Sequence, residues 1–282
     1  MQLDAADVPF EPAAAAGTAA AFLLWSCGVA GSLAVATVIA ARMWRGLPAV
    51  SPRPHAPARW HGGEVAIAFV VFYCLQLLAA AVAPEDMPLR LAAAAAATLF
   101  ATNVTAAMLV GEGAEPATLG FGPVRLREDV TLGVAAVALT LVPLLGLAAA
   151  LDRLVPYRHT LIDFLAAHRE LPAIGLVWFV AVVAAPVTEE FLFRRVLQGW
   201  LQQREPQWGR AAPVVVSALA FALAHVGQGL AWVPLFFFGL VAGYLARQTG
   251  SIVPGIFFHG LFNAISVLLV LAQTAPGTAG GG

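Results

Sequence analysis

Charge is scarce in this chain of 282 residues: 11 % of the residues are Asp, Glu, Lys or Arg, whereas 60 % are hydrophobic. Soluble domains usually carry about 25 % charged residues, so the composition excludes an ordinary soluble domain and indicates that most of the chain lies in a bilayer. Lysine is absent, and all fifteen cations are arginine. Because the net charge is only −1, no basic field would attract nucleic acid, and we expect no nucleic-acid partner.

The chain has only two cysteines. Its first residues also lack the basic leader that a signal peptide needs. Cys27 and Cys74 both lie inside apolar runs, which favours packed free thiols over a disulfide. The first residues of the chain are acidic rather than basic, and the apolar run that follows, 17–41, is long enough to span a bilayer. We therefore expect this run to be a retained first transmembrane helix.

Long apolar runs recur along the chain, and a transmembrane helix needs about 20 such residues. The candidate spans are 17–41, 65–83, 91–110, 130–150, 172–193, 211–227, 230–246 and 252–272. Between them, 45–63 is a loop rich in Pro and Arg, and 154–170 is typical of an extramembrane connection with a short amphipathic helix. We predict an all-α, polytopic membrane helix bundle of about eight transmembrane helices, surrounded by lipid.

Arginine is distributed unevenly among the loops, which predicts an orientation. Loops 42–63, 111–129, 194–210 and 247–251 hold eleven of the fifteen arginines. This bias predicts that these loops are cytoplasmic and both termini are outside. The Ala-rich, lysine-free composition is typical of a prokaryotic protein, so we expect a multi-pass protein of the prokaryotic cell (inner) membrane.

Two adjacent acids, Glu189 and Glu190, follow the uncharged run "AIGLVWFVAVVAA" and precede Arg194. Glu190 and Arg194 are four residues apart, in the register of a helical ion pair, whereas Glu189 is rotated about 100° from Glu190. One acid can thus be neutralised while the other faces a different neighbour. The plain alternative is that these charges mark the end of a helix at the water interface.

Further polar residues lie inside apolar runs, where they usually face the bundle interior and mark function. His225 ends "FALAH", and His259 and Asn263 lie four residues apart in the last span. A glutamate near a histidine can activate water, and a second histidine with an amide can stabilise an oxyanion. These are the parts needed to hydrolyse a peptide bond. The motif H-E-x-x-H is absent, yet Glu189, His225 and His259 would also be a ligand set for zinc.

Three motifs, in order, carry a family resemblance: "EEFLFR" (189–194), "FALAH" (221–225) and "HGLFN" (259–263). They match E-E-x-x-x-R, F-x-x-x-H and H-x-x-x-N of the CPBP (CAAX protease and bacteriocin-processing, Abi) intramembrane proteases. The resemblance covers roughly 115–272. It implies a protease core at 115–273 and lineage-specific N-terminal transmembrane helices at 17–114. The ends, 1–16 and 274–282, consist largely of small residues, and we expect them to be mobile tails.

The resemblance implies a role for each matched residue. Glu189 would be the general base that activates water, with His225 beside it, and His259 and Asn263 would form the oxyanion hole. Glu190 and Arg194 would hold the helix in place. Family members have been described both as metalloproteases and as glutamate-dependent enzymes; we favour the reaction without a required cofactor, because Asn is a poor zinc ligand and a good amide donor, and keep zinc as the alternative.

We therefore expect an intramembrane endopeptidase that acts on a membrane-associated peptide or protein, prenylated substrates being less expected in a prokaryote. Two rival hypotheses stay open: a non-catalytic immunity or scaffold protein of the same fold, and a small transporter with a proton-relay acid pair. Depth poses a further question, since a sixth helix starting near Arg210 would place His225 about 22 Å deep, while Glu189 near a helix end would be shallow. We expect the fifth helix to continue to about Gln203, which would bring Glu189 to mid-membrane.

Overall fold

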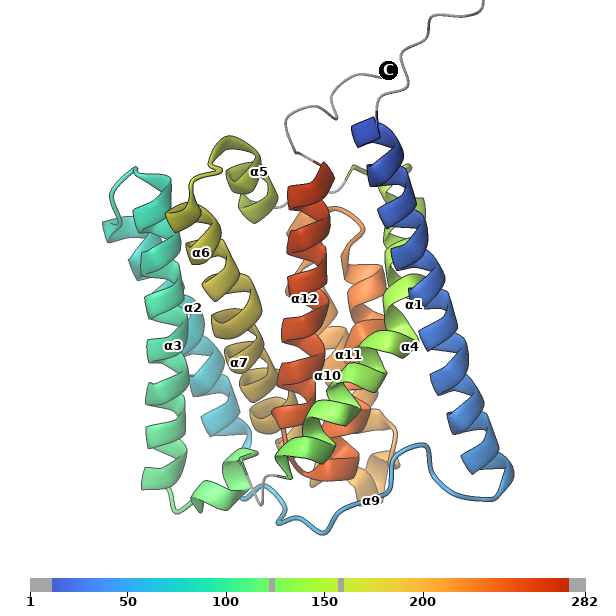
Figure 1. The fold of residues 1–282 in the computed structure, drawn as a ribbon. Helices are drawn as coiled ribbons and strands as arrows, with labels where there is room; N and C mark the ends of the chain where they lie inside the picture. Colours follow the sequence, from blue (N-terminus) through green and yellow to red (C-terminus); the bar gives the residue numbers. More distant parts are fainter. Residues whose placement is uncertain (1–11, 122–124, 157–159, 274–282) are drawn as a thin grey trace, which may run out of the picture.

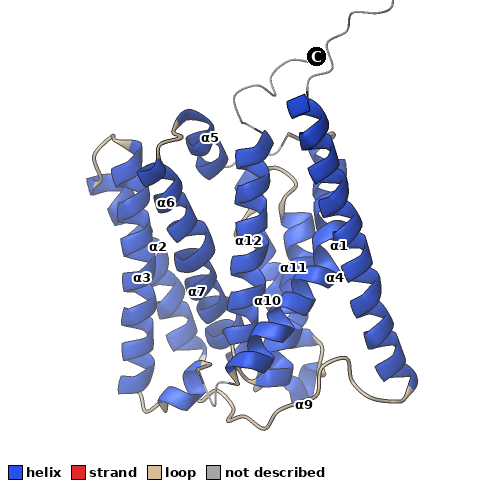
Figure 2. Cartoon of the chain, in the orientation of Figure 1, coloured by secondary structure: helices blue, strands red, loops and turns tan. Residues whose placement is uncertain are grey.

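The computed structural model describes residues 12–121, 125–156 and 160–273, and these form helices and no strand (Figures 1 and 2). The longer helices are α1 (Pro12–Trp44), α2 (Gly62–Val82), α3 (Met87–Gly111), α4 (Leu126–Asp152), α11 (Trp232–Thr249) and α12 (Val253–Gln273). The shorter ones are η1 (Pro116–Leu119), α5 (Thr160–Ala167), α9 (Glu205–Trp208), α10 (Ala212–Leu223) and η4 (Val226–Gln228).

One further helix runs without interruption from Leu171 to Gln202 but changes its winding along the way. It consists of α6 (Leu171–Phe179), η2 (Val180–Ala184), α7 (Ala185–Glu189), η3 (Glu190–Leu197) and α8 (Gln198–Gln202), of which η2 and η3 are π-helical. We call this element the site helix, because it carries the acid pair.

Six of the described helices are long and apolar enough to cross a membrane: α1, α2, α3, α4, the site helix and α12. This confirms the prediction of an all-α, polytopic membrane bundle. The two remaining predicted spans correspond to α10, a shorter apolar helix of 12 residues, and α11, of 18 residues, which pack against each other. The protein is thus an integral membrane protein with a bundle of eight long or half-length helices among its described residues.

The start of α1 and the end of α12 lie at the same end of the bundle (Figure 1). The loop that follows α1 and the short helix α9 lie at the other end. The described ends of the chain thus lie at one end of the bundle, and the predicted orientation in the membrane stays a prediction. The amphipathic connection predicted at 154–170 contains α5, as expected.

The predicted boundary of the N-terminal tail shifts, because α1 begins at Pro12 rather than at residue 17. The rest of that tail, 1–11, and the C-terminal tail, 274–282, lie outside the described residues. Cys27 and Cys74 are free thiols as predicted, but both are exposed rather than packed. Each therefore faces outward from the bundle, where lipid solvates an apolar thiol.

The loop between α1 and α2 contacts the C-terminal half of the site helix. This is the half that the arginine bias predicts to face the cytoplasm. Trp60 Nε1 donates a hydrogen bond to the Val196 carbonyl (2.8 Å), and Gln203 Nε2 donates to the Trp60 carbonyl (2.8 Å). The Arg195 guanidinium lies over the Trp60 ring, 5.1 Å from its centroid. The N-terminal region is therefore packed into the bundle rather than appended to it.

The depth question is answered by the length of the site helix. It has 32 residues, about 48 Å at 1.5 Å per residue, and Glu189 lies close to its middle. Glu189 is about 20 Å from the Gln202 end, and His225 is about 20 Å from the start of α10 at Ala212. The expected continuation to about Gln203 is confirmed, and the two side chains lie at similar depth.

Candidate active site

The π-helical turn η2 begins the site because it leaves one backbone carbonyl without a helical donor. The Ala185 N–H bonds to the carbonyl of Val180, five residues back. Pro186, the next residue that could reach Ala181, has no N–H to donate. Asn263 Nδ2 on α12 supplies the missing donor and lies 2.8 Å from the Ala181 carbonyl. Such π-bulges are frequent at functional sites, and this one fixes α12 against the site helix.

Glu190 is fully buried and belongs to an ion pair within the site helix. Its Oε2 lies 3.4 Å from Arg194 Nε, in the predicted i,i+4 register. Arg194 Nη1 donates to Ser217 Oγ on α10 (3.2 Å), and that hydroxyl donates to the Phe193 carbonyl (2.7 Å). Because both charges are buried in a medium of low dielectric constant, each needs the other to remain ionised.

His259 on α12 lies between the two glutamates. Its Nδ1 is 3.3 Å from Glu190 Oε1, and its Nε2 is 3.8 Å from Glu189 Oε2. An ionised carboxylate only accepts hydrogen bonds, so Nδ1 donates to Glu190 and Nε2 is the atom turned toward Glu189. Glu189 retains 22 % of its side-chain exposure, whereas Glu190 retains none. The two acids therefore differ: Glu190 is neutralised by neighbours, and Glu189 faces an open side.

The ring of His259 is surrounded by aromatic side chains. Phe238 and Phe221 approach it edge-on, with ring centroids 5.0 and 6.0 Å away. Phe221 also lies under the Arg194 guanidinium, 4.8 Å from its central carbon. These rings exclude water from one side of the ion pair, and a low local dielectric constant strengthens its electrostatic interactions.

His225 follows the end of α10, and its ring packs on Phe221 at a centroid distance of 4.9 Å. Its Nδ1 lies 2.8 Å from the Phe221 carbonyl. A carbonyl only accepts, so Nδ1 carries the proton and a neutral His225 has its lone pair on Nε2. Phe221 links His225 to His259. Its Nδ1 thus bonds its own helix, and among the described residues no hydrogen bond or ion pair joins His225 to Glu189.

Three residues of the site escaped the sequence analysis. Gly255 lies where a Cβ atom would come within 2.5 Å of Glu190 Oε2, so only glycine lets α12 approach this closely. Ser217 holds the Arg194 guanidinium. Thr188, fully buried, shares a 2.8 Å hydrogen bond with Thr102 on α3. The four-residue spacing from Gly255 to His259 was a readable signal, but the partners of Ser217 and Thr188 depend on tertiary packing.

Zinc was the alternative cofactor, with Glu189, His225 and His259 as the expected ligands. Within the described ranges, no three His, Cys, Asp or Glu side chains converge so that they could hold a metal ion. The Nδ1 contacts of His225, with a backbone carbonyl, and of His259, with Glu190, leave Nε2 as the nitrogen of each ring that could bind a metal. The three-ligand set expected from the sequence is not brought together among the described residues.

Comparison with known protein families gives a match to the model described as "Type II CAAX prenyl endopeptidase Rce1-like", over residues 172–265. The matched segment begins inside the site helix and ends just after Asn263. It includes Glu189, Glu190, Arg194, His225, His259 and Asn263. Comparisons with curated proteins and with solved structures found no match. Residues 172–265 are therefore similar to the Rce1-like, type II CAAX prenyl endopeptidases of the CPBP family.

Proposed function

We propose that this protein is an intramembrane endopeptidase that hydrolyses peptide bonds of membrane-associated polypeptides with water activated by Glu189. The observation that supports this most directly is the placement of His259 between two glutamates, of which Glu190 is paired with Arg194 and Glu189 is not. A buried acid pair is costly in a membrane. An arrangement that neutralises one acid and leaves the other open is typical of a functional site.

In the proposed reaction, the Glu189 carboxylate takes a proton from a water molecule, and the water oxygen adds to the peptide carbonyl carbon. The lone pair on His225 Nε2 would accept a hydrogen bond that orients this water. The oxygen of the tetrahedral intermediate would be stabilised by His259, whose ring would carry one N–H toward Glu190 and a second, on Nε2, toward this oxygen, and by an Asn263 N–H. The proton on Glu189 then passes to the leaving nitrogen as the C–N bond breaks, which regenerates the carboxylate.

Asn263 has a double task in this proposal, because an amide nitrogen carries two N–H groups. One of them donates to the Ala181 carbonyl. The second is available for an oxyanion. The hydrogen bond to the π-turn would hold the amide plane fixed, which is what preorganised transition-state stabilisation requires. Glu190 does the same for His259 through Nδ1.

The experiment uses the full chain reconstituted in lipid vesicles with a panel of membrane-anchored peptides, prenylated and unprenylated, in ¹⁸O-labelled water. We expect cleavage that places one ¹⁸O in the new carboxyl group. Glu189→Gln should lower the rate about 10²–10⁴-fold, the range for loss of a general base. Glu112→Gln, the same chemical change at the exposed end of α3, is the matched control.

The rival functions give different results in the same preparation. A scaffold protein would bind a partner equally well before and after Glu189→Gln and would cleave nothing in the panel. A transporter would show proton-coupled flux across the vesicle membrane that Glu189→Gln abolishes. Cleavage without ¹⁸O uptake, or cleavage unaffected by Glu189→Gln, would overturn the proposed reaction.

A further inference from the structure

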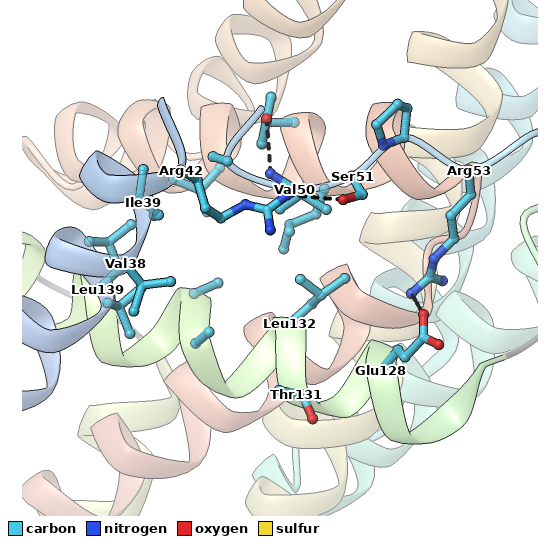
Figure 3. Close-up of a pocket in the computed structure, with 18 of the residues that line it drawn as sticks. Val38, Ile39, Arg42, Val50, Ser51, Arg53, Glu128, Thr131, Leu132 and Leu139 are labelled. Atoms are coloured by element: carbon cyan, nitrogen blue, oxygen red, sulfur yellow. Dashed lines mark hydrogen bonds and ion pairs between the residues drawn. The ribbon is translucent and has the colours of Figure 1, made fainter. Parts of the chain in front are cut away.

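A cleft lies between α1, the loop that follows it and α4, with α11 behind (Figure 3). Its volume is about 830 Å³. Val38 and Ile39 line it from α1, and Leu132 and Leu139 line it from α4. None of the site residues described above borders it, so it is distinct from the candidate active site.

The walls of the cleft are apolar because α1 touches the bundle along only part of its surface. α1 packs against α4, and Ser32 Oγ donates to the Ala138 carbonyl (2.6 Å) at the contact. Toward its Trp44 end, α1 diverges from α4 (Figure 1). An apolar opening of this kind in a bilayer is filled by lipid chains, because an empty one would forfeit dispersion contacts along its whole lining.

The end of the cleft nearest the α1–α2 loop is cationic. Its lining there includes the arginines Arg42, Arg53, Arg125 and Arg127 with the acid Glu128. Arg53 is already paired with Glu128 at 3.1 Å and with Asp129, and Arg125 lies 3.4 Å from Glu128. Two carboxylates thus face four guanidinium groups, and an excess of positive charge remains at the mouth.

Arg42 and Arg127 carry this excess. Arg42 donates only to neutral acceptors, from Nε to the Pro48 carbonyl (3.0 Å) and from Nη2 to Ser51 Oγ (2.9 Å). The second bond is drawn in Figure 3, where the guanidinium extends over the apolar lining. Arg127 is exposed, and no ion pair joins it to a carboxylate within the described residues. Tyr244 borders the same mouth, and tyrosine is enriched at the level of lipid headgroups.

We propose that this cleft binds one phospholipid with a net negative headgroup. An acyl chain lies between α1 and α4 against Val38, Ile39, Leu132 and Leu139, and the phosphate is held by Arg42 and Arg127. Basic pockets between transmembrane helices recognise anionic headgroups in this way. The bound lipid fills the gap that α1 leaves against α4. The proposal does not depend on the proposed peptidase reaction.

The test measures lipid binding to the full chain in a neutral detergent by native mass spectrometry, with phosphatidylglycerol and phosphatidylcholine of identical acyl chains as probes. We expect one tightly bound phosphatidylglycerol and weaker binding of phosphatidylcholine. The double variant Arg42→Gln/Arg127→Gln should weaken phosphatidylglycerol binding about 25-fold, since each interfacial arginine contributes about fivefold. Phosphatidylcholine binding should change little.

The matched control is Arg59→Gln/Arg204→Gln, which removes the same charge from exposed residues that do not line the cleft. An equal loss of binding in this control would overturn the proposal in favour of diffuse surface charge. Equal affinity for the two lipids in the unaltered chain would overturn it as well. Displacement of phosphatidylglycerol by millimolar inorganic phosphate would show a site for free phosphate rather than for lipid.

A second variant keeps the test independent of the arginines. Val38 lines the cleft and is 59 % exposed. Val38→Trp therefore places a large side chain in the cleft without displacing a packed neighbour, so the fold should tolerate it. If an acyl chain occupies the cleft, this variant should reduce binding of phosphatidylglycerol at least tenfold with all four arginines intact. Unchanged binding would show that the lipid lies elsewhere.

Discussion

His259 joins Glu189 and Glu190, two neighbours in sequence that face different surroundings. Its Nδ1 lies 3.3 Å from Glu190 and its Nε2 3.8 Å from Glu189. One ring on α12 thus contacts both acids of the site helix. Acids that only marked a helix end would face water, whereas both of these meet a buried histidine of another helix.

Glu190→Gln should destabilise the protein much more than Glu189→Gln. The first change removes the carboxylate that, among the described residues, pairs with the buried Arg194, and an orphaned buried charge costs about 3–5 kcal/mol. The second removes a partly exposed carboxylate and should cost about 1 kcal/mol or less. Unfolding of the two variants in detergent, followed by tryptophan fluorescence or circular dichroism, measures the difference. Equal losses of unfolding free energy in the two variants would contradict the conclusion that Glu190 is neutralised by Arg194 and Glu189 is not.

Gly255→Ala should lower both stability and peptidase activity, although alanine is the better helix former. The added Cβ would lie 2.5 Å from Glu190 Oε2, so α12 or the acid must move, and His259 moves with it. Gly146→Ala in α4 is the matched control, since nothing lies within 4 Å of its Cβ position. That change should be neutral or should stabilise the protein by about 0.5–1 kcal/mol. Loss in the control but not at Gly255 would contradict the close approach.

The contribution of sequence reasoning is clearest for the site helix. The i,i+4 spacing was sufficient to pair Glu190 with Arg194, because helical register alone brings these residues together. The apolar spacing after Arg195 predicted that the helix continues, and the length of the observed helix confirms it. Both conclusions rest on interactions within one element, where periodicity determines geometry.

Contacts between different helices were harder to predict from the sequence. Nothing in the spacing of "HGLFN" shows that Asn263 binds the Ala181 carbonyl, because that acceptor is created by a π-turn and by Pro186. That His225 lies beside Glu189 stays a prediction; the sequence did not reveal that α10 ends two residues before His225 and that its Nδ1 bonds back to the Phe221 carbonyl. The orientation of a side chain at a helix end depends on the local turn, which residue type and spacing do not reveal. The prediction that both cysteines are packed was wrong, because an apolar thiol is as compatible with lipid as with a protein core.

Asn263→Ala should cost about 1–3 kcal/mol of stability, because it leaves the Ala181 carbonyl buried without a donor. Pro186→Ala supplies a backbone N–H five residues after Ala181, which a π-turn could use in place of Asn263. In that background, Asn263→Ala should therefore cost less. A double-mutant cycle on detergent unfolding measures this coupling. If the costs of the two changes simply add, the amide and the proline do not act on the same carbonyl.

The last prediction concerns α3, which lies outside the matched segment 172–265 but contacts the site helix beside Glu189. Thr102 and Thr188 share a 2.8 Å hydrogen bond, and Thr188 is fully buried. Thr102→Val should cost about 1–3 kcal/mol by leaving the buried Thr188 hydroxyl without its partner. Thr188→Val should cost less, because the Thr102 hydroxyl keeps its hydrogen bond to the Thr98 carbonyl (3.0 Å). The double change Thr102→Val/Thr188→Val should be nearly neutral, because two methyl groups replace both partners. Unfolding measurements on the three variants test this order. If the proposed peptidase activity falls in Thr102→Val and returns in the double variant, α3 positions the acid pair, and this N-terminal helix contributes to the proposed reaction. If the double variant is the worst of the three, the contact is ordinary packing and the hydrogen bond has no role in placing Glu189.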